Sequence, residues 1–144
     1  MNFPARKADP DTELLSRAEA ASHGAYCPYS KFAVGAAVRT RSGAIYTGCN
    51  VENISYSITT CAERNALAAA IVAEGPRAEI ARIAIFARND TTHAPCPPCG
   101  ACRQAIAENA PAAEVIFYGP GLQLERKTPA DLLPGAFAFE SKCD

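Results

Sequence analysis

The chain has 144 residues, of which 49% are hydrophobic and 20% charged, a composition that suits one globular domain with a substantial core. Fourteen Lys and Arg stand against fifteen Asp and Glu, and no basic run stands out. This balance disfavours a nucleic-acid partner, because phosphate binding needs clustered positive charge. The first residues lack the apolar segment of a signal peptide, and the apolar run Ala66–Ala73 is too short to span a bilayer. We therefore expect a cytoplasmic protein without membrane association.

We expect a loose tail over residues 1–10 and a single domain over residues 11–144. Apolar spacing predicts a helix over Asp11–Ser22, and two strand-like runs flank the turn Arg41-Ser42-Gly43 as a hairpin. These strands span Phe32–Arg39 and Ala44–Cys49, and a polar loop over Asn50–Thr60 follows them.

The second half alternates helices with strands. The Ala-rich segment Cys61–Glu74 is nearly apolar all round, which predicts a buried helix that Gly75-Pro76 ends. The remaining predicted elements are a strand over Ile80–Ala87, a loop over Asn89–Pro98, a helix over Cys99–Asn109, a strand over Glu114–Tyr118 and a short helix over Pro129–Leu133. This order predicts a layered α/β domain with a mixed sheet.

Seven cysteines, an odd number in a chain expected to be cytoplasmic, favour metal binding or thiol chemistry over a disulfide framework. Three of them lie in the motifs Cys61-Ala62-Glu63 and Pro98-Cys99-Gly100-Ala101-Cys102, each of which opens a predicted helix. Cys99 and Cys102 share one face of a first helical turn, and Cys61 would join them from a neighbouring helix start. Three thiolates suffice for a catalytic zinc ion, which keeps one position for water. The alternative is a set of buried or redox-active thiols.

Glu63 lies two residues after Cys61 and could carry protons beside such a metal. A local alternative exists, because Thr60 precedes Glu63 by three residues, the spacing of a helix capping box. The Pro-Cys-x-x-Cys motif downstream favours the catalytic interpretation.

The combination of Cys-x-Glu with Pro-Cys-x-x-Cys resembles the small homotetrameric zinc-dependent cytidine deaminases that use three cysteine ligands. The resemblance extends from Ala25 to Phe137. The segments that carry it are Tyr26-Cys27-Pro28-Tyr29-Ser30-Lys31-Phe32, Val34-Gly35-Ala36-Ala37, Gly48-Cys49-Asn50-Val51-Glu52-Asn53, Cys61-Ala62-Glu63-Arg64, Cys99-Gly100-Ala101-Cys102-Arg103-Gln104 and Leu132-Leu133-Pro134-Gly135-Ala136-Phe137.

This resemblance implies a three-layer α/β/α domain, one Zn²⁺ per subunit held by Cys61, Cys99 and Cys102, and Glu63 as the proton shuttle. It also implies substrate contacts: Asn50 and Glu52 for the ribose, Phe32 for the pyrimidine, Tyr56 and the backbone amide of Ala62 as further contacts, and Phe137 from a neighbouring subunit of a homotetramer. Arg64 and Gln104 would support the metal site from its surroundings. Arg64 could offset the negative charge of three thiolates and so restore electrophilicity to the ion.

The remaining cysteines and the two histidines carry weaker signals. Cys27, Cys49 and Cys143 are expected to be small buried hydrophobes or a tail thiol, and Cys96 a loop residue. A fourth cysteine ligand would block the water position. His23 and His93 have no second histidine at metal-ligand spacing.

The expected reaction is the hydrolytic deamination of cytidine or deoxycytidine in pyrimidine salvage, in which zinc-activated hydroxide attacks C4 and Glu63 transfers the protons. Three alternatives remain: a deaminase of a cytosine-containing antibiotic nucleoside of the blasticidin S type, a non-catalytic zinc-stabilised binding module, and a polynucleotide editor. The pair Asn50 and Glu52 favours an ordinary ribose over the first. A binding module would have a fourth protein ligand, and an editor would have a basic surface.

Overall fold

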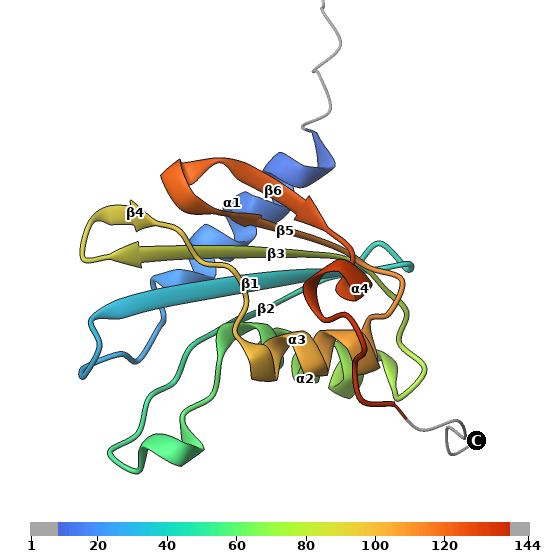
Figure 1. Cartoon of the computed structure of the whole chain (residues 1–144), viewed down its shortest axis with the longest axis horizontal. Helices are drawn as coiled ribbons and strands as arrows, with labels where there is room; N and C mark the ends of the chain where they lie inside the picture. The colour runs from blue at the N-terminus through green and yellow to red at the C-terminus, as the bar shows by residue number, and fades with distance from the viewer. Residues whose placement is uncertain (1–8, 139–144) are drawn as a thin grey trace, which may run out of the picture.

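The structure, a computed structural model, describes residues 9–138 and contains one mixed sheet (Figure 1). The strands hydrogen-bond in the order β2-β1-β3-β5-β6, with β4 paired to β3. Among the named strands of the described residues, the β3–β5 pairing is parallel and the others are antiparallel. The elements in chain order are α1 (Pro10–Ser22), β1 (Phe32–Thr40), β2 (Ile45–Cys49), the short 3₁₀ turn η1 (Tyr56–Ile58), α2 (Ala62–Glu74), β3 (Ile80–Asn89), β4 (Thr92–Ala94), α3 (Gly100–Asn109), β5 (Glu114–Tyr118), the 3₁₀ turn η2 (Pro120–Leu122), β6 (Leu124–Lys127) and α4 (Pro129–Leu132).

Helices cover both faces of the sheet, which confirms the predicted α/β/α layers (Figure 1). On one face, Leu14 and Ala18 of α1 pack on Ala37 and Ala84. On the other face, apolar side chains of α2 and α3 pack on alternate residues of the central strands to form the larger core. The strand β1 is buried almost throughout because helices lie against both of its faces.

Gly48 allows the start of α2 to lie directly on β2. A Cβ atom at this position would approach the backbone nitrogen of Ala66 to 2.5 Å and the carbonyl oxygen of Ala62 to 2.6 Å. Such distances are sterically forbidden, so any larger residue would push the helix away from the sheet. Because Cys61 and Glu63 lie at this end of α2, the glycine helps to place the residues of the predicted site.

The predicted strands and helices are confirmed, with bounds that differ by up to two residues. Two short strands were missed. The strand β4 lies inside the predicted polar loop, and β6 is an edge strand with largely exposed side chains, so neither carries a clear hydrophobic alternation. The prediction that α2 is buried all round is wrong for the single chain, since Val72 is 86% exposed. Of the expected N-terminal tail, residues 1–8 lie outside the described part, and Pro10 begins α1.

Within residues 9–138, every helix lacks either the length or the apolar character that crossing a membrane requires.

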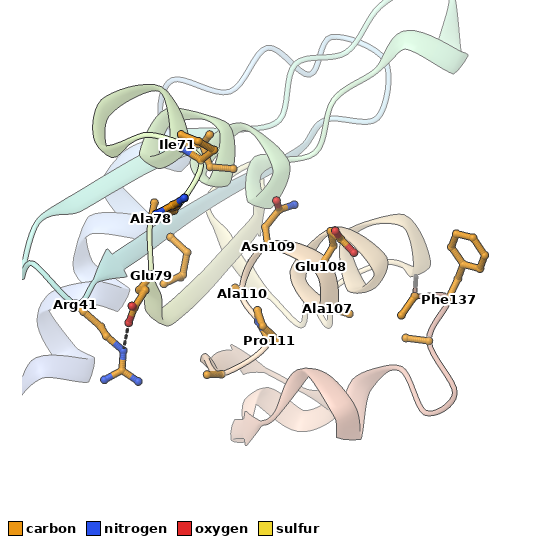
Figure 2. Close-up of a pocket in the computed structure, with 16 residues that line it drawn as sticks. Arg41, Ile71, Ala78, Glu79, Ala107, Glu108, Asn109, Ala110, Pro111 and Phe137 are labelled. Atoms are coloured by element: carbon orange, nitrogen blue, oxygen red, sulfur yellow. Dashed lines mark ion pairs between the residues drawn. The ribbon is translucent and has the colours of Figure 1, made fainter. Parts of the chain in front are cut away.

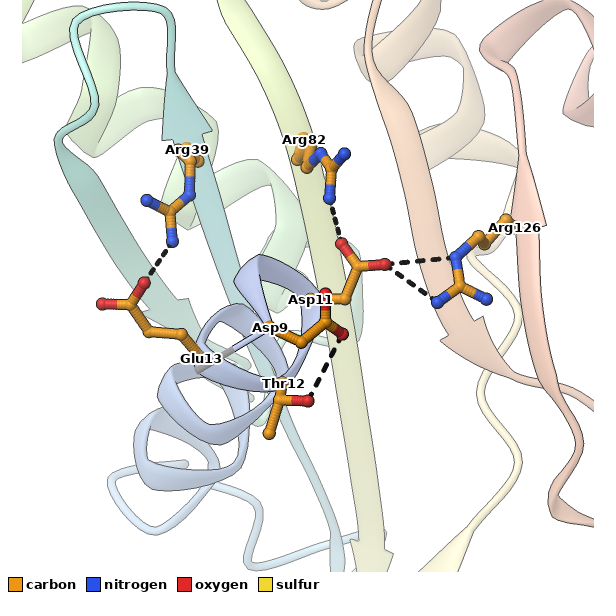
Figure 3. A network of polar contacts seen from close by, with 7 residues as sticks. All are labelled: Asp9, Asp11, Thr12, Glu13, Arg39, Arg82 and Arg126. Carbon is orange, nitrogen blue, oxygen red and sulfur yellow. Dashed lines mark hydrogen bonds and ion pairs between the residues drawn. The ribbon is translucent and has the colours of Figure 1, made fainter. Parts of the chain in front are cut away.

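Asp11 joins α1 to the sheet through two arginines (Figure 3). Its carboxylate is buried, and it pairs with Arg82 of β3 and, at 2.8 Å, with Arg126 of β6. Both arginines are partly exposed, so solvent weakens the pairing.

We expect Asp11→Asn to lower the free energy of unfolding by about 2 kcal/mol, because a buried carboxylate that accepts bonds from two cations is lost. Urea denaturation monitored by circular dichroism measures the change. The matched control is Glu13→Gln, whose half-exposed carboxylate pairs only with Arg39 among the described residues. Equal losses in the two variants would contradict a special role for Asp11.

Candidate metal centre and active site

The starts of α2 and α3 bring three cysteine sulfurs together. Cys61 and Cys99 are the residues immediately before the two helices, and both have extended backbone geometry, with ψ angles of 152° and 168°. Cys102 follows one turn later in α3 and is fully buried. The Sγ atoms of these three residues all lie within 4.8 Å of one another.

The arrangement of the three sulfurs fits zinc. Zinc–sulfur bonds of about 2.3 Å at tetrahedral angles separate two sulfurs by about 3.8 Å. The Sγ atoms of Cys61 and Cys99 are 3.9 Å apart. Among residues 9–138 this group contains no fourth cysteine, histidine or carboxylate, so a bound ion would keep a coordination position for a small molecule.

The surroundings of the sulfurs also favour the negatively charged thiolate that binds a cation. Hydrogen bonding with Cys102 and Cys99, together with the charge of Arg64, lowers the pKa of Cys61 to about 6 although burial opposes the shift. The same hydrogen bond with Cys61, together with burial, raises the pKa of Cys102. One sulfur thus carries negative charge that the neighbouring thiols share, and the free N–H groups of both helix starts favour that charge.

Glu63 lies beside this cluster in the first turn of α2 and is only 4% exposed. Burial raises the pKa of Glu63, although hydrogen bonding with its own backbone and with Cys102 opposes the shift. A carboxyl group with a raised pKa binds a proton more readily than a free one, which suits a group that must both accept and return a proton.

The capping-box alternative for Glu63 is wrong. Cys61, not Thr60, is the capping position of α2, and no side chain caps the helix there. The hydroxyl of Thr60 instead accepts a hydrogen bond of 3.0 Å from the side-chain amide of Asn65. Glu63 is therefore free to face the sulfurs.

Arg64 contacts both the cluster and the preceding loop. Its charge and a hydrogen bond contribute to the lowered pKa of Cys61. Its Nη2 atom also donates to the carbonyl oxygen of Thr59 at 3.1 Å. The guanidinium thus links the first ligand of the cluster to the loop that precedes it.

That loop forms one wall of a pocket with a volume of about 410 Å³. Glu52 lies in it, held by the backbone N–H groups of Tyr29, at 2.9 Å, and Ser30, at 3.3 Å. Hydrogen bonding with Ser30 is the main reason that the pKa of Glu52 is lowered, so the carboxylate is charged at neutral pH. The remaining lining residues are Tyr56 and Thr59.

Asn50 is held between β2 and β1. Its Oδ1 atom accepts a hydrogen bond from the backbone of Val34, and its Nδ2 atom donates to the carbonyl of Phe32, both at 2.8 Å. Oδ1 can accept a second hydrogen bond and Nδ2 can donate one more. Asn50 can therefore bind a hydroxyl only in the orientation that β1 imposes.

The other predicted substrate contacts lie around the same loops. Phe32 is half-buried at the start of β1, and Tyr56 is 74% exposed and makes an edge contact with the ring of Tyr29, at 5.9 Å between centroids. Ala62 is the first residue of α2, so its N–H group has no acceptor within the helix.

Phe137 does not line this pocket. It lines a larger hollow of about 770 Å³ between the C-terminal ends of α2 and α3, where Arg41 pairs with Glu79 (Figure 2). None of the three clustered cysteines lines that hollow. The amide of Gln104 donates to the carbonyl oxygen of Phe137 at 3.0 Å, so this side chain holds the C-terminal segment.

Among residues 9–138, the remaining cysteines and both histidines stay outside the sulfur cluster. Cys96 is a loop residue, as predicted, and burial raises its pKa to about 12, so it remains a neutral thiol packed on the core. Cys27 and Cys49 are half-buried, whereas Cys143 lies outside the described residues. The ring of His93 stacks on Phe86 and makes an edge contact with the ring of Tyr118.

Three residues of the pocket were not singled out from the sequence. Tyr29 and Ser30 hold Glu52 through backbone N–H groups, and Thr59 receives the bond from Arg64. Every residue except proline has a backbone N–H group, so the residue type does not reveal which of these groups will bind Glu52. Tyr29 and Ser30 lie in the turn-forming segment that contributes to the family resemblance, but that segment indicates no role for either residue.

Comparison with known proteins agrees with this geometry. Residues 8–118 match the family described as the cytidine and deoxycytidylate deaminase zinc-binding region. The chain is 46% identical to a cytidine deaminase of Halalkalibacterium halodurans over 133 residues, which cover 91% of this chain and 96% of that protein. The crystal structure of a cytidine deaminase from Burkholderia pseudomallei superposes with a TM-score of 0.81 at 43% identity, covering 90% of this chain and 100% of the other.

A crystal structure of the Mycobacterium tuberculosis cytidine deaminase gives a TM-score of 0.76 at 36% identity, with coverage of 91% and 100%. The family match, the identities over almost the whole chain and the three gathered sulfurs agree. The chain belongs to the family of zinc-binding cytidine and deoxycytidylate deaminases.

Proposed function

We propose that this protein hydrolyses cytidine or deoxycytidine to uridine or deoxyuridine and ammonia. The observation that carries the proposal is the buried carboxyl of Glu63 beside three sulfurs that fit zinc and leave a coordination position open. Relatives at up to 46% identity that are named cytidine deaminases support the substrate class.

Zinc held by Cys61, Cys99 and Cys102 would supply a Lewis acid that lowers the pKa of water. The protein supplies the proton transfers around it. Glu63 takes a proton from the attacking water and delivers it to N3 of the pyrimidine while the water oxygen bonds to C4. It then passes the remaining proton of that oxygen to the amine, so that the C4–N bond breaks, ammonia leaves and a C4 carbonyl remains. Its raised pKa suits this alternation, since a strongly acidic carboxyl would not return the proton. Arg64 would offset part of the thiolate charge and keep Cys61 in its ionised form.

The pocket that Glu52 and Thr59 line, next to the loop that leads to Cys61, would hold the nucleoside. We assign Asn50 and Glu52 to the sugar hydroxyls, because both are nearly buried and rigidly held. We assign Phe32 to the face of the pyrimidine. Tyr56 and the Ala62 backbone N–H would complete the contacts from the loop and from the start of α2.

We expect Glu52→Gln to lower kcat/KM for cytidine by about 10- to 100-fold, since a hydrogen bond to a charged group contributes about 1.5–3 kcal/mol. Steady-state deamination of cytidine and of 2′,3′-dideoxycytidine measures the effect. The loss should shrink with the dideoxy substrate, which lacks the hydroxyl groups in question. An equal loss with both substrates would contradict the assignment of Glu52 to the sugar.

An assembly of several copies, a homotetramer in our proposal, would complete each site. Large apolar side chains remain exposed beside the pocket in a single chain, namely Ile54, Tyr56 and Ile58, exposed by 60–81%. Phe137, which does not line the pocket around Glu52 in its own chain, would enter the site of a neighbouring copy. We further propose that the protein acts in the cytoplasm in pyrimidine salvage.

The alternative functions receive less support. The relatives at 38–46% identity that cover most of this chain are named cytidine deaminases rather than antibiotic deaminases. A purely structural zinc module would have no use for the buried Glu63. A net charge of -1 does not favour a polynucleotide substrate.

The direct test is ammonia release and absorbance loss on incubating the purified protein with cytidine and deoxycytidine. Turnover should stop on removal of the metal by a chelator and return with added Zn²⁺. A zinc-loaded protein that leaves both nucleosides unchanged would overturn the proposal.

A further inference from the structure

Arg103, in the first half of α3, links the metal cluster to the C-terminal part of the fold. Its Nε atom donates to the carbonyl oxygen of Pro98 at 2.7 Å, and its backbone N–H donates to the carbonyl oxygen of Cys99 at 2.9 Å. The two carbonyls lie on either side of the Cys99 Cα atom. The bond to Cys99 is the ordinary helical bond of α3, whereas the bond to Pro98 depends on the arginine side chain.

Cys99 needs such support more than the other two cysteines. Cys102 is buried inside α3 and Cys61 is half-buried, whereas Cys99 is exposed and lies just outside the helix. The loop that leads to it contains Pro97 and Pro98, which have no N–H groups, so the loop cannot secure itself through donors of its own at these positions.

The same guanidinium reaches α4. Its Nη1 atom donates at 2.8 Å to the carbonyl oxygen of Leu132, the last residue of that helix. Carbonyl groups at a helix end lack intrahelical partners, and the planar guanidinium satisfies one of them while Nε keeps its bond to Pro98. A lysine ammonium is a compact charge at the end of a flexible chain. It would not donate to the carbonyl oxygens of Pro98 and Leu132 in the fixed geometry of the planar guanidinium.

We infer that Arg103 is a positioning residue that sets how tightly the cluster retains its metal, by holding Cys99 in place. Through Leu132 it also ties the ligand loop to the segment that carries Phe137. The inference rests on the proposed function, because it presumes that the three sulfurs bind zinc. Arg103 itself would touch neither metal nor substrate.

The test measures metal release from the zinc-loaded protein without any substrate. We expect Arg103→Ala to raise the rate of zinc transfer to a chromogenic chelator by about 10- to 100-fold, the usual cost of losing a residue that supports a metal ligand. The rate of zinc transfer from Arg103→Lys should lie between the rates of Arg103→Ala and the wild type. Added guanidinium ion should slow release from Arg103→Ala, and the absorption bands of the cobalt-substituted protein should shift.

Arg126→Ala is the matched control, because it removes an arginine that stabilises the fold through Asp11, far along the chain from the cluster. It should lower thermal stability and leave zinc release close to that of the wild type. Equal release from both alanine variants, or wild-type release from Arg103→Ala, would overturn the inference. Failure of the wild type to deaminate cytidine would refute the proposed function separately, since zinc retention is measured without substrate.

Discussion

Glu63→Ala should abolish nearly all turnover while the protein still binds one zinc ion per chain. In the proposed mechanism the buried carboxyl would handle successive proton transfers, and each such transfer contributes about 10²- to 10⁴-fold to the rate. We therefore expect kcat to fall by at least about 10⁴-fold. Ammonia release measures the rate, and atomic absorption measures the metal.

Two further variants make this expectation specific. Glu63→Gln preserves the volume of the side chain but cannot accept and return the proton, so it should be nearly as inactive as Glu63→Ala. Glu108→Gln, on the exposed side of α3, should retain the activity of the wild type. Substantial activity in either Glu63 variant would remove that residue from the centre of the mechanism.

Cys102→Ala should lose the metal, the activity and part of the thermal stability together. Cys102 is the fully buried ligand, and the cluster contains no other described residue that could replace its sulfur. A metal that binds only the folded state stabilises it, so the wild type should melt at a lower temperature once a chelator removes its zinc. The melting temperature of Cys102→Ala should be the same with and without the chelator.

Cys49→Ala provides the comparison for that experiment. Cys49 is a half-buried thiol of β2 that lies outside the metal cluster. Its removal should leave zinc content, turnover and the effect of the chelator on melting unchanged. A chelator-sensitive melting temperature in Cys102→Ala would show that the metal is held by other residues.

The site shows where inference from sequence succeeds. The spacing of Cys99 and Cys102 predicts two sulfurs on one helical face, and the structure places them together with Cys61. Ligand chemistry depends on residue type and short spacing, both of which are visible in a sequence. The prediction that Asn50 and Glu52 bind the sugar stays a prediction, although both side chains are nearly buried.

Other features depend on residues that are distant in the chain. The bonds from Arg103 to Pro98 and Leu132, and from the Tyr29 backbone to Glu52, exist only after the loops pack together. The edge strand β6 forms because the backbone of β5 hydrogen-bonds to it. The residues of β6 do not show the alternation of apolar and polar side chains that is typical of a strand.

The sequence alone determined the layered α/β class, most element bounds and the three sulfurs with their neighbouring carboxyl, because local periodicity and short motifs encode them. The tertiary structure decided which backbone groups hold Glu52, that Arg103 reaches Leu132, that Glu63 is buried rather than capping a helix, and that Phe137 does not line the pocket around Glu52. These outcomes depend on long-range packing, which brings together backbone groups that every residue shares.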